Sequence, residues 1–99
     1  MKNVFVYVIT NNINKKLYIG KTNNLKRRWN EHKTRFEKTM PISCVIFKYG
    51  HENFNIESIL NFSSENDAYM YEAIFISKAR KENVILYNIT DGGLGPCGV

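Results

Sequence analysis

The sequence lacks the features that mark several large classes of protein. No apolar run approaches the roughly 18 residues of a membrane-spanning helix, and the N-terminus, MKNVFVYVITNN, has no signal-peptide cleavage site. Cys44 and Cys97 form no CxxC or Cys/His pattern, so a zinc site is not indicated and both are expected to be reduced thiols. We therefore expect a soluble protein of the cytoplasm with no membrane contact.

Several standard catalytic signatures are missing as well. The chain has no GxxxxGK[ST], HExxH or GxSxG motif, and no internal repeat. Its 99 residues are 43% hydrophobic and 13% aromatic, which is enough for one packed domain. An active site, if present, must therefore be assembled from residues dispersed along the chain.

Positive charge is concentrated in one quarter of the chain. The net charge is +5, but residues 15–38 carry nine cations and two anions, so this segment is +7 and the remainder is −2. Such a segment suits a polyanion, because contacts with phosphates supply most sequence-independent affinity for nucleic acids. A solvated basic helix face gives the same pattern, so charge alone leaves both interpretations open.

Hydrophobic periodicity predicts three strands and three helices. Apolar runs at 4–10 and 17–20 predict a hairpin, and residues 54–60 predict a third strand. Helices are expected from about Asn24 to Lys38, from Pro41 to Tyr49, and after Ser64 to about Lys81. These elements predict an α+β fold, a small three-stranded antiparallel sheet flanked by helices.

The hairpin and the helix that follows it present polar side chains to each other. A turn tip at 11–14 would place Thr10 opposite Lys15 and Tyr7 opposite Tyr18. In the helix, an apolar stripe recurs at spacings of four, three and four, formed by Leu25, Trp29, His32 and Phe36. Arg28 lies beside this stripe, four residues before His32, so these two side chains project from adjacent turns.

Glu72 interrupts the apolar stripe of the last helix. The stripe comprises Ala68, Tyr71, Phe75, Ile76 and Ala79. A buried, unpaired carboxylate costs several kcal/mol, so Glu72 needs a cation, a metal or a hydrogen-bond donor beside it. Extension of the side chain to the helix edge, or pairing with a lysine or arginine, satisfies the same requirement. The sequence leaves both possibilities open.

Six polar residues occur in an order that resembles the GIY-YIG nuclease family. They are Tyr7 in FVY, Tyr18 in YIG, Arg28 and His32 in LKRRWNEH, Glu72, and Asn88 in LYNITDGG. The segments KYGHENF and YNITDGG resemble the catalytic domains of phage and group I intron homing endonucleases in particular. One departure is plain, since Phe5 and Val6 stand where the family name has Gly and Ile. The tyrosine after them, which carries the role, is retained.

The resemblance implies a metal-dependent DNA endonuclease of the homing type that hydrolyses phosphodiester bonds. It implies that Tyr7 is the base or orients the attacking water, with Tyr18 holding the water or the phosphate. Arg28 has a fork of donors suited to a phosphate. Glu72 would hold a single Mg²⁺, or another divalent metal such as Mn²⁺. A phenol is a poor base at neutral pH unless nearby cations lower its pKa, which Arg28 and the metal would do.

The remaining residues have supporting roles in this scheme. His32 assists proton transfer, holds Tyr7 by a hydrogen bond or only fills the edge of the core, and Asn88 fixes the site. Cations expected to follow the DNA backbone are Lys15, Lys16, Lys21, Lys26, Arg27, Lys33 and Arg35. We expect a catalytic domain over 1–93 and a tail at 94–99, in a protein that is monomeric or dimerises on DNA. The tail would begin a linker to a separate DNA-binding region, or the protein is a small stand-alone nuclease with weak specificity.

Two other functions remain open from the sequence. One is a structure-specific or repair nuclease, because such enzymes resemble the same family. The other is a module that binds nucleic acid through its basic helix without cutting it.

Overall fold

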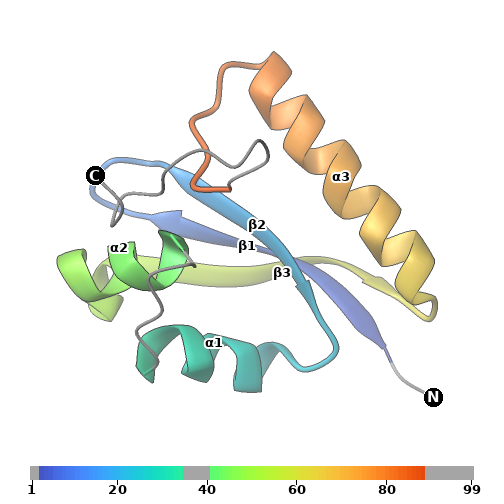
Figure 1. Ribbon diagram of the computed structural model, residues 1–99, viewed down its shortest axis with the longest axis horizontal. Helices are drawn as coiled ribbons and strands as arrows, with labels where there is room; N and C mark the ends of the chain where they lie inside the picture. Colours follow the sequence, from blue (N-terminus) through green and yellow to red (C-terminus); the bar gives the residue numbers. More distant parts are fainter. Residues whose placement is uncertain (1–2, 35–40, 89–99) are drawn as a thin grey trace.

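A three-stranded antiparallel sheet lies between two layers of helix (Figure 1). The computed structural model describes residues 3–34 and 41–88. In chain order its elements are β1 (Val4–Asn11), β2 (Leu17–Thr22), α1 (Leu25–Thr34), α2 (Pro41–Tyr49), a 3₁₀ turn (His51–Asn53), β3 (Phe54–Phe62) and α3 (Glu65–Lys81). The strand order is β2-β1-β3, and both neighbouring pairs are antiparallel. The predicted α+β class is confirmed.

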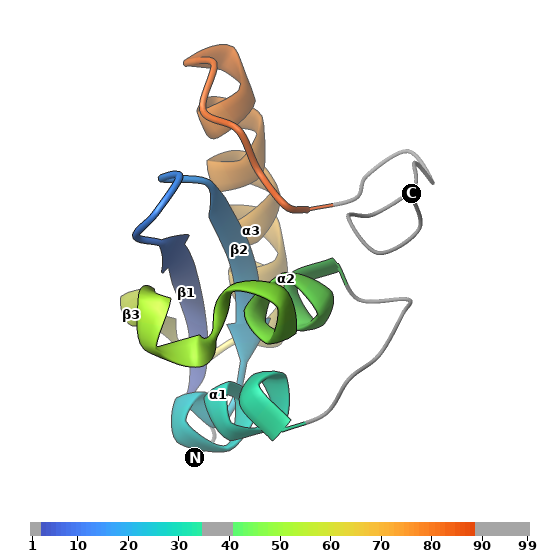
Figure 2. The ribbon, with the colours of Figure 1, turned by 90° about the vertical axis from the view of Figure 1, so that its left-hand side faces the viewer.

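The two faces of the sheet bury two separate cores, because side chains alternate along each strand. On β1, Val4 and Val6 pack with α3, whereas Tyr7 and Ile9 pack with α1 and α2. In Figure 1 α3 lies above the sheet and α1 lies below it, while α2 overlaps the left-hand end of the strands. Figure 2 shows the same layers from the side, with α1 and α2 in front of the strands. Strand β2 is an edge strand that both layers can reach.

The predicted hairpin register is wrong by two residues. Tyr7 lies opposite Gly20 rather than Tyr18, and Thr10 lies opposite Leu17 rather than Lys15.

The cause is a loop that begins one residue later than predicted. Asn11 is fully buried and still belongs to β1, and its backbone N–H donates to the Lys16 carbonyl at 3.0 Å. Its side-chain oxygen accepts from the Ile13 N–H at 2.9 Å, which holds the start of the loop. Lys15 closes the loop with a left-handed φ of 66°.

Helix boundaries follow the capping signals in the sequence. The Asn24 side chain accepts from the Arg27 N–H at 3.0 Å, and Ser64 accepts from the Asp67 N–H at 3.4 Å. α1 is described to Thr34, and Phe36 of the predicted stripe lies outside the described residues.

Two predictions for individual side chains are wrong. Tyr71 is 40% exposed and stacks on Phe62, with ring centroids 5.0 Å apart, so it lies beside the core rather than in it. Cys44 is buried in α2 and is disulfide-bonded, so it is no reduced thiol; Cys97 lies outside the described residues. A sequence pattern shows only how nearby cysteines are spaced, so this disulfide was not predictable.

Over residues 3–34 and 41–88, no helix is long and apolar enough to span a membrane.

Candidate active site

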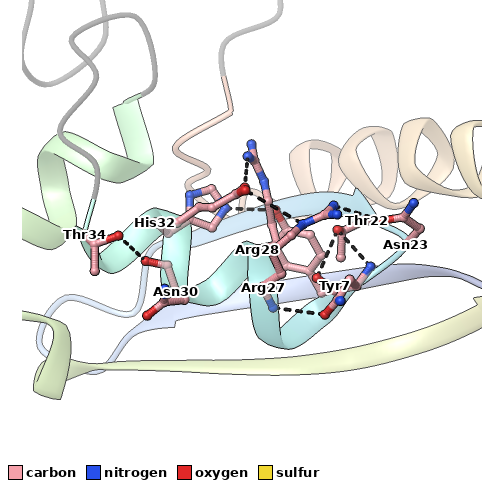
Figure 3. Close-up of polar contacts among 10 residues, drawn as sticks. Tyr7, Thr22, Asn23, Arg27, Arg28, Asn30, His32 and Thr34 are labelled. Atoms are coloured by element: carbon pink, nitrogen blue, oxygen red, sulfur yellow. Dashed lines mark hydrogen bonds and ion pairs between the residues drawn. The ribbon is translucent and has the colours of Figure 1, made fainter.

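Tyr7 and His32 form a buried hydrogen-bonded pair between the sheet and α1. The Tyr7 hydroxyl lies 3.0 Å from Nε2 of His32, and each residue is 1% exposed (Figure 3). His32 therefore holds Tyr7 by a hydrogen bond, one of the roles considered from the sequence. Tyr18 completes the aromatic cluster, with its ring centroid 5.8 Å from that of His32.

Gly20 makes room for the Tyr7 phenol. It lies opposite Tyr7 in the hairpin, and a Cβ added at Gly20 would lie 2.5 Å from the Tyr7 hydroxyl oxygen. A side chain at this position would displace the phenol from His32. The glycine of YIG is therefore required by the close approach of a side chain from the neighbouring strand.

Burial sets the protonation of this cluster. It raises the pKa of Tyr7 well above the usual value for a phenol, and the adjacent Tyr18 adds to the rise. The hydrogen bond and charge of Arg28 lower the pKa of Tyr7, as expected, but do not offset burial. Burial and Arg28 together lower the pKa of His32 to about 4. His32 is consequently neutral at pH 7 and has one ring nitrogen able to accept a proton.

Arg28 extends from α1 beside this pair (Figure 3). Its side chain is 28% exposed, and Nη1 donates to the Glu31 carboxylate at 3.1 Å. The guanidinium also lowers the pKa of the Tyr7 and Tyr18 phenols, against the larger effect of burial. A permanently charged fork of donors is thus held at the sheet edge by its neighbours.

Glu72 faces the other side of the same edge. With Tyr18 and Asn88 it lines a pocket of about 490 Å³ between α3 and β2. Burial raises the pKa of Glu72, and only the charge of Lys21 opposes the rise. Within the described part of the chain, the Glu72 carboxylate has no hydrogen bond or ion pair. Pairing with a lysine or arginine is therefore not observed among these residues, whereas Glu72 is partly exposed, as extension to the helix edge would make it.

Asn88 attaches the segment after α3 to strand β2. Its side-chain amide donates to the Ile19 carbonyl at 2.7 Å and accepts from the Ile19 N–H at 2.9 Å. Leu86 forms a parallel bridge with Leu17 just before it. This double hydrogen bond fixes the strand between Tyr18 and Gly20, as the positioning role predicted for Asn88 requires.

The structure brings the six predicted residues together around the β2 edge of the sheet. Tyr18 interacts with residues on both sides of this edge. Burial raises the pKa of Tyr18, Arg28 on α1 lowers it, and Glu72 on α3 raises it.

The predicted DNA-binding cations do not all gather at this site. Lys21 and Arg27 line a second pocket of about 520 Å³ together with Arg28. Within it, Nζ of Lys21 forms an ion pair with Oε1 of Glu65 at 3.7 Å. Lys15 and Lys16 belong to the hairpin loop at the opposite end of β2. Of the others, Lys26 and Lys33 lie on α1, and Arg35 lies outside the described residues.

One cation in the Glu72 pocket was missed from the sequence. Arg80 lines this pocket together with Glu72 and Asn88. It follows Glu72 by eight residues, with Ile76 midway, so all three lie on one face of α3. That spacing is the signal that would have identified it.

Comparison with known families assigns the fold. Residues 3–87 match the model of the GIY-YIG catalytic domain. The chain belongs to the GIY-YIG family. Two candidate endonucleases of Enterobacteria phage T4 are similar in sequence: segE is 36% identical over 93 residues and segD is 34% identical over 90 residues. These matches cover 92% and 91% of this chain but only 42% and 39% of the two phage proteins.

Solved structures with the same fold include the catalytic domain of the homing endonuclease I-TevI. One has a TM-score of 0.69 at 20% identity and covers 89% of this chain and 99% of that one. A variant of the I-TevI domain with one glutamate replaced by alanine has a TM-score of 0.71 at 25% identity, covering 96% and 100%. The likeness therefore extends over nearly the whole length of the I-TevI domain.

Proposed function

We propose that this GIY-YIG domain is a Mg²⁺-dependent DNA endonuclease of the homing type. The observation that carries the proposal is the position of Tyr18, whose phenol interacts with Arg28 on one side and with Glu72 on the other. A cation suited to a phosphate and a carboxylate suited to a metal thus flank one hydroxyl group. Similarity to the two candidate endonucleases of phage T4, and to the catalytic domain of the homing endonuclease I-TevI, supports DNA as the substrate.

Glu72 fits a single hard divalent cation. Burial raises the pKa of Glu72, so its carboxylate lacks the neutralising partner that a cation would supply. Over residues 3–34 and 41–88, no three His, Cys, Asp or Glu side chains are grouped to hold a metal. A single carboxylate donor, that of Glu72, favours Mg²⁺ or Mn²⁺, because these ions keep several water ligands. Zn²⁺ takes three or four protein ligands. Bound there, the metal would neutralise charge on the phosphoryl oxygens.

The protein's own groups divide the remaining work. Arg28 donates to the non-bridging oxygens of the scissile phosphate, where negative charge grows during attack. Tyr18 is partly exposed and lines the Glu72 pocket, so we place it against the attacking water or the phosphate. Tyr7 is 1% exposed and acts through its hydrogen bonds.

His32 holds the Tyr7 phenol in place rather than taking its proton. The Tyr7 hydroxyl is hydrogen-bonded to Nε2 of the neutral imidazole across 3.0 Å, and the lowered pKa of His32, about 4, makes the ring a poor acceptor of the proton itself. Because burial holds both phenol pKa values high, proton removal by the phenols is expected to require the bound metal or a more alkaline pH.

Domain organisation and location follow as parts of the same proposal. The chain spans about two fifths of the phage T4 relatives, so we propose residues 1–93 as a catalytic unit within such enzymes. Target recognition would then depend largely on other segments, because lysine and arginine contacts to phosphates read no sequence. The unit acts as a monomer on DNA in the cytoplasm of the host cell, and a single site cuts one strand at a time.

Cleavage of supercoiled plasmid tests the proposal. We expect the wild type to nick or linearise the plasmid with Mg²⁺ and to be inactive in EDTA, whereas Arg28→Ala and Glu72→Ala lose cleavage. Glu57→Ala is the matched control, because Glu57 is an exposed carboxylate on β3, at the far edge of the sheet. Retained cleavage in Glu72→Ala, or an inactive wild type with every divalent metal, contradicts the proposal.

A further inference from the structure

Arg80 supplies a cation to the Glu72 pocket that the proposed mechanism does not use. The pocket is lined by α3 and the β2 edge, with Glu72 near the middle of the helix and Arg80 near its C-terminal end. After α3 the chain turns back to β2 beside this end of the helix (Figure 1), which brings Asn88 next to Arg80.

Most donors of the Arg80 guanidinium have no protein partner within the described residues. Nη2 donates to the Asn88 carbonyl at 3.5 Å, which is a long hydrogen bond. In the same part of the chain, no carboxylate lies within ion-pair distance of Arg80. Glu72 is not neutralised by it either, because the pKa of Glu72 responds to burial and to Lys21. The pocket therefore holds an unpaired acid and an unpaired cation at separate positions.

The distance between Glu72 and Arg80 suits a DNA strand that has one phosphate at a metal on Glu72 and another phosphate at Arg80. A guanidinium presents five N–H donors in a fixed fork that fits phosphate oxygens. Eight residues of helix cover about 12 Å, and a DNA strand advances about 3.4 Å per nucleotide along its axis. A strand that follows the groove from Glu72 would therefore bring a phosphate a few nucleotides away to Arg80.

We infer that Arg80 binds a backbone phosphate of the cleaved strand, a few nucleotides from the scissile phosphate. The inference rests on the proposed function and assigns the path of the substrate: the cleaved strand lies along the groove between α3 and β2. Arg80 would add affinity and register there without contacting the reacting atoms.

Salt dependence of binding tests the contact. We would measure the dissociation constant of a short labelled duplex in EDTA over a series of salt concentrations. Loss of one phosphate contact lowers the slope of log K against log salt by about 0.9 for duplex DNA. We expect this change for Arg80→Gln, and no change for Arg80→Lys. Lys81→Gln is the matched control, because it removes the same charge from the next residue, which lies outside the pocket.

A substrate series separates a phosphate contact from a purely structural role. Single methylphosphonates, which remove the charge of one phosphate, would be placed at successive positions around the cut. We expect one position a few nucleotides away to weaken binding of the wild type and to have no effect on Arg80→Gln. Arg80→Gln could instead bind all substrates more weakly and still respond to the methylphosphonate at every position to which the wild type responds. That result would mean that Arg80 only supports Asn88, and it would overturn the inference.

The outcomes distinguish this inference from the function on which it rests. If the wild type cleaves DNA and needs Glu72, but Arg80→Gln behaves like Lys81→Gln, only the inference fails. A wild type that neither binds nor cuts DNA overturns both. Thermal melting of each variant identifies a loss that comes from unfolding.

Discussion

The two sides of the active site differ in how their polar groups are satisfied. On the α1 side, Tyr7, Arg28 and His32 are hydrogen-bonded to one another or to neighbouring residues. On the α3 side, Glu72 and Arg80 line an open pocket, and no ion pair is found for either within the described residues. One side is complete in the free protein, whereas the other offers charges that only a ligand would neutralise.

This difference indicates that the two sides of the site have different roles. A satisfied hydrogen-bond network holds donors in place before the substrate arrives, which is the condition for electrostatic stabilisation of a transition state. An unsatisfied carboxylate is costly in the folded protein and gains most from a bound cation. Changes on the α1 side should therefore affect both stability and activity, and changes on the α3 side activity alone.

The largest effect is expected from Glu72→Gln. Loss of a metal ligand removes several kcal/mol of charge stabilisation, so cleavage should fall by about 10²-fold or more. The free energy of unfolding should stay the same or rise slightly, because a poorly solvated charge is removed. Single-turnover plasmid cleavage and urea unfolding measure the two quantities. A clear loss of stability in Glu72→Gln would break the comparison.

Acid should destabilise the α1 side through His32. The pKa of His32 is about 4 in the folded protein and 6.5 in a free histidine, so the unfolded chain binds the proton more readily between these values. Stability should fall as the pH drops from 6.5 to 4, by roughly 3 kcal/mol. Urea unfolding at each pH measures this loss. It should shrink in His32→Gln and remain in His51→Gln, which alters an exposed histidine; equal curves for the two variants would exclude His32 as the cause.

Tyr7→Phe should destabilise the protein by about 1–3 kcal/mol, because it leaves the buried Nε2 of His32 without its partner. Cleavage should fall at the same time. Tyr71→Phe removes the same hydroxyl from a tyrosine that is 40% exposed and lies outside the Glu72 pocket, and it should change neither quantity. Thermal melting with cleavage assays compares the two variants. If Tyr7→Phe melts like the wild type, the α1 side is less tightly built than the hydrogen bonds imply.

The smallest effect is expected from Lys21→Gln. The positive charge of Lys21 lowers the pKa of Glu72, against the larger effect of burial, and Glu72 must be ionised to hold a metal. Its removal should move the acidic limb of the pH–rate profile to higher pH. Lys16→Gln, at the other end of the hairpin, should leave the limb in place. A limb that moves equally in both variants would mean that net charge alone controls the profile.

Local signals in the sequence were sufficient for the elements of the fold. Alternation marked the strands, and capping side chains at Asn24 and Ser64 marked the helix starts. The hairpin register was not predictable, because it depends on the buried side chain of Asn11 and the left-handed backbone of Lys15. Neither feature is visible in the pattern of apolar residues.

The candidate site was predictable as a set of residues but not as a geometry. The family resemblance identified six residues, and they meet at the β2 edge. The burial of Tyr7, which leaves Tyr18 as the phenol facing the pocket, is a tertiary property that no spacing encodes. Arg80 was missed although its helical spacing from Glu72 was available, because a lone arginine near a helix end is common on any surface.

The most direct measurement is the titration of the Glu72 carboxyl group by NMR, with and without Mg²⁺. Without the metal, burial should hold the pKa of Glu72 above its ordinary value. Addition of Mg²⁺ should lower that pKa, because the cation favours the ionised carboxylate. A pKa at the ordinary value that Mg²⁺ does not move would contradict the assignment of Glu72 as the metal-binding group of the site.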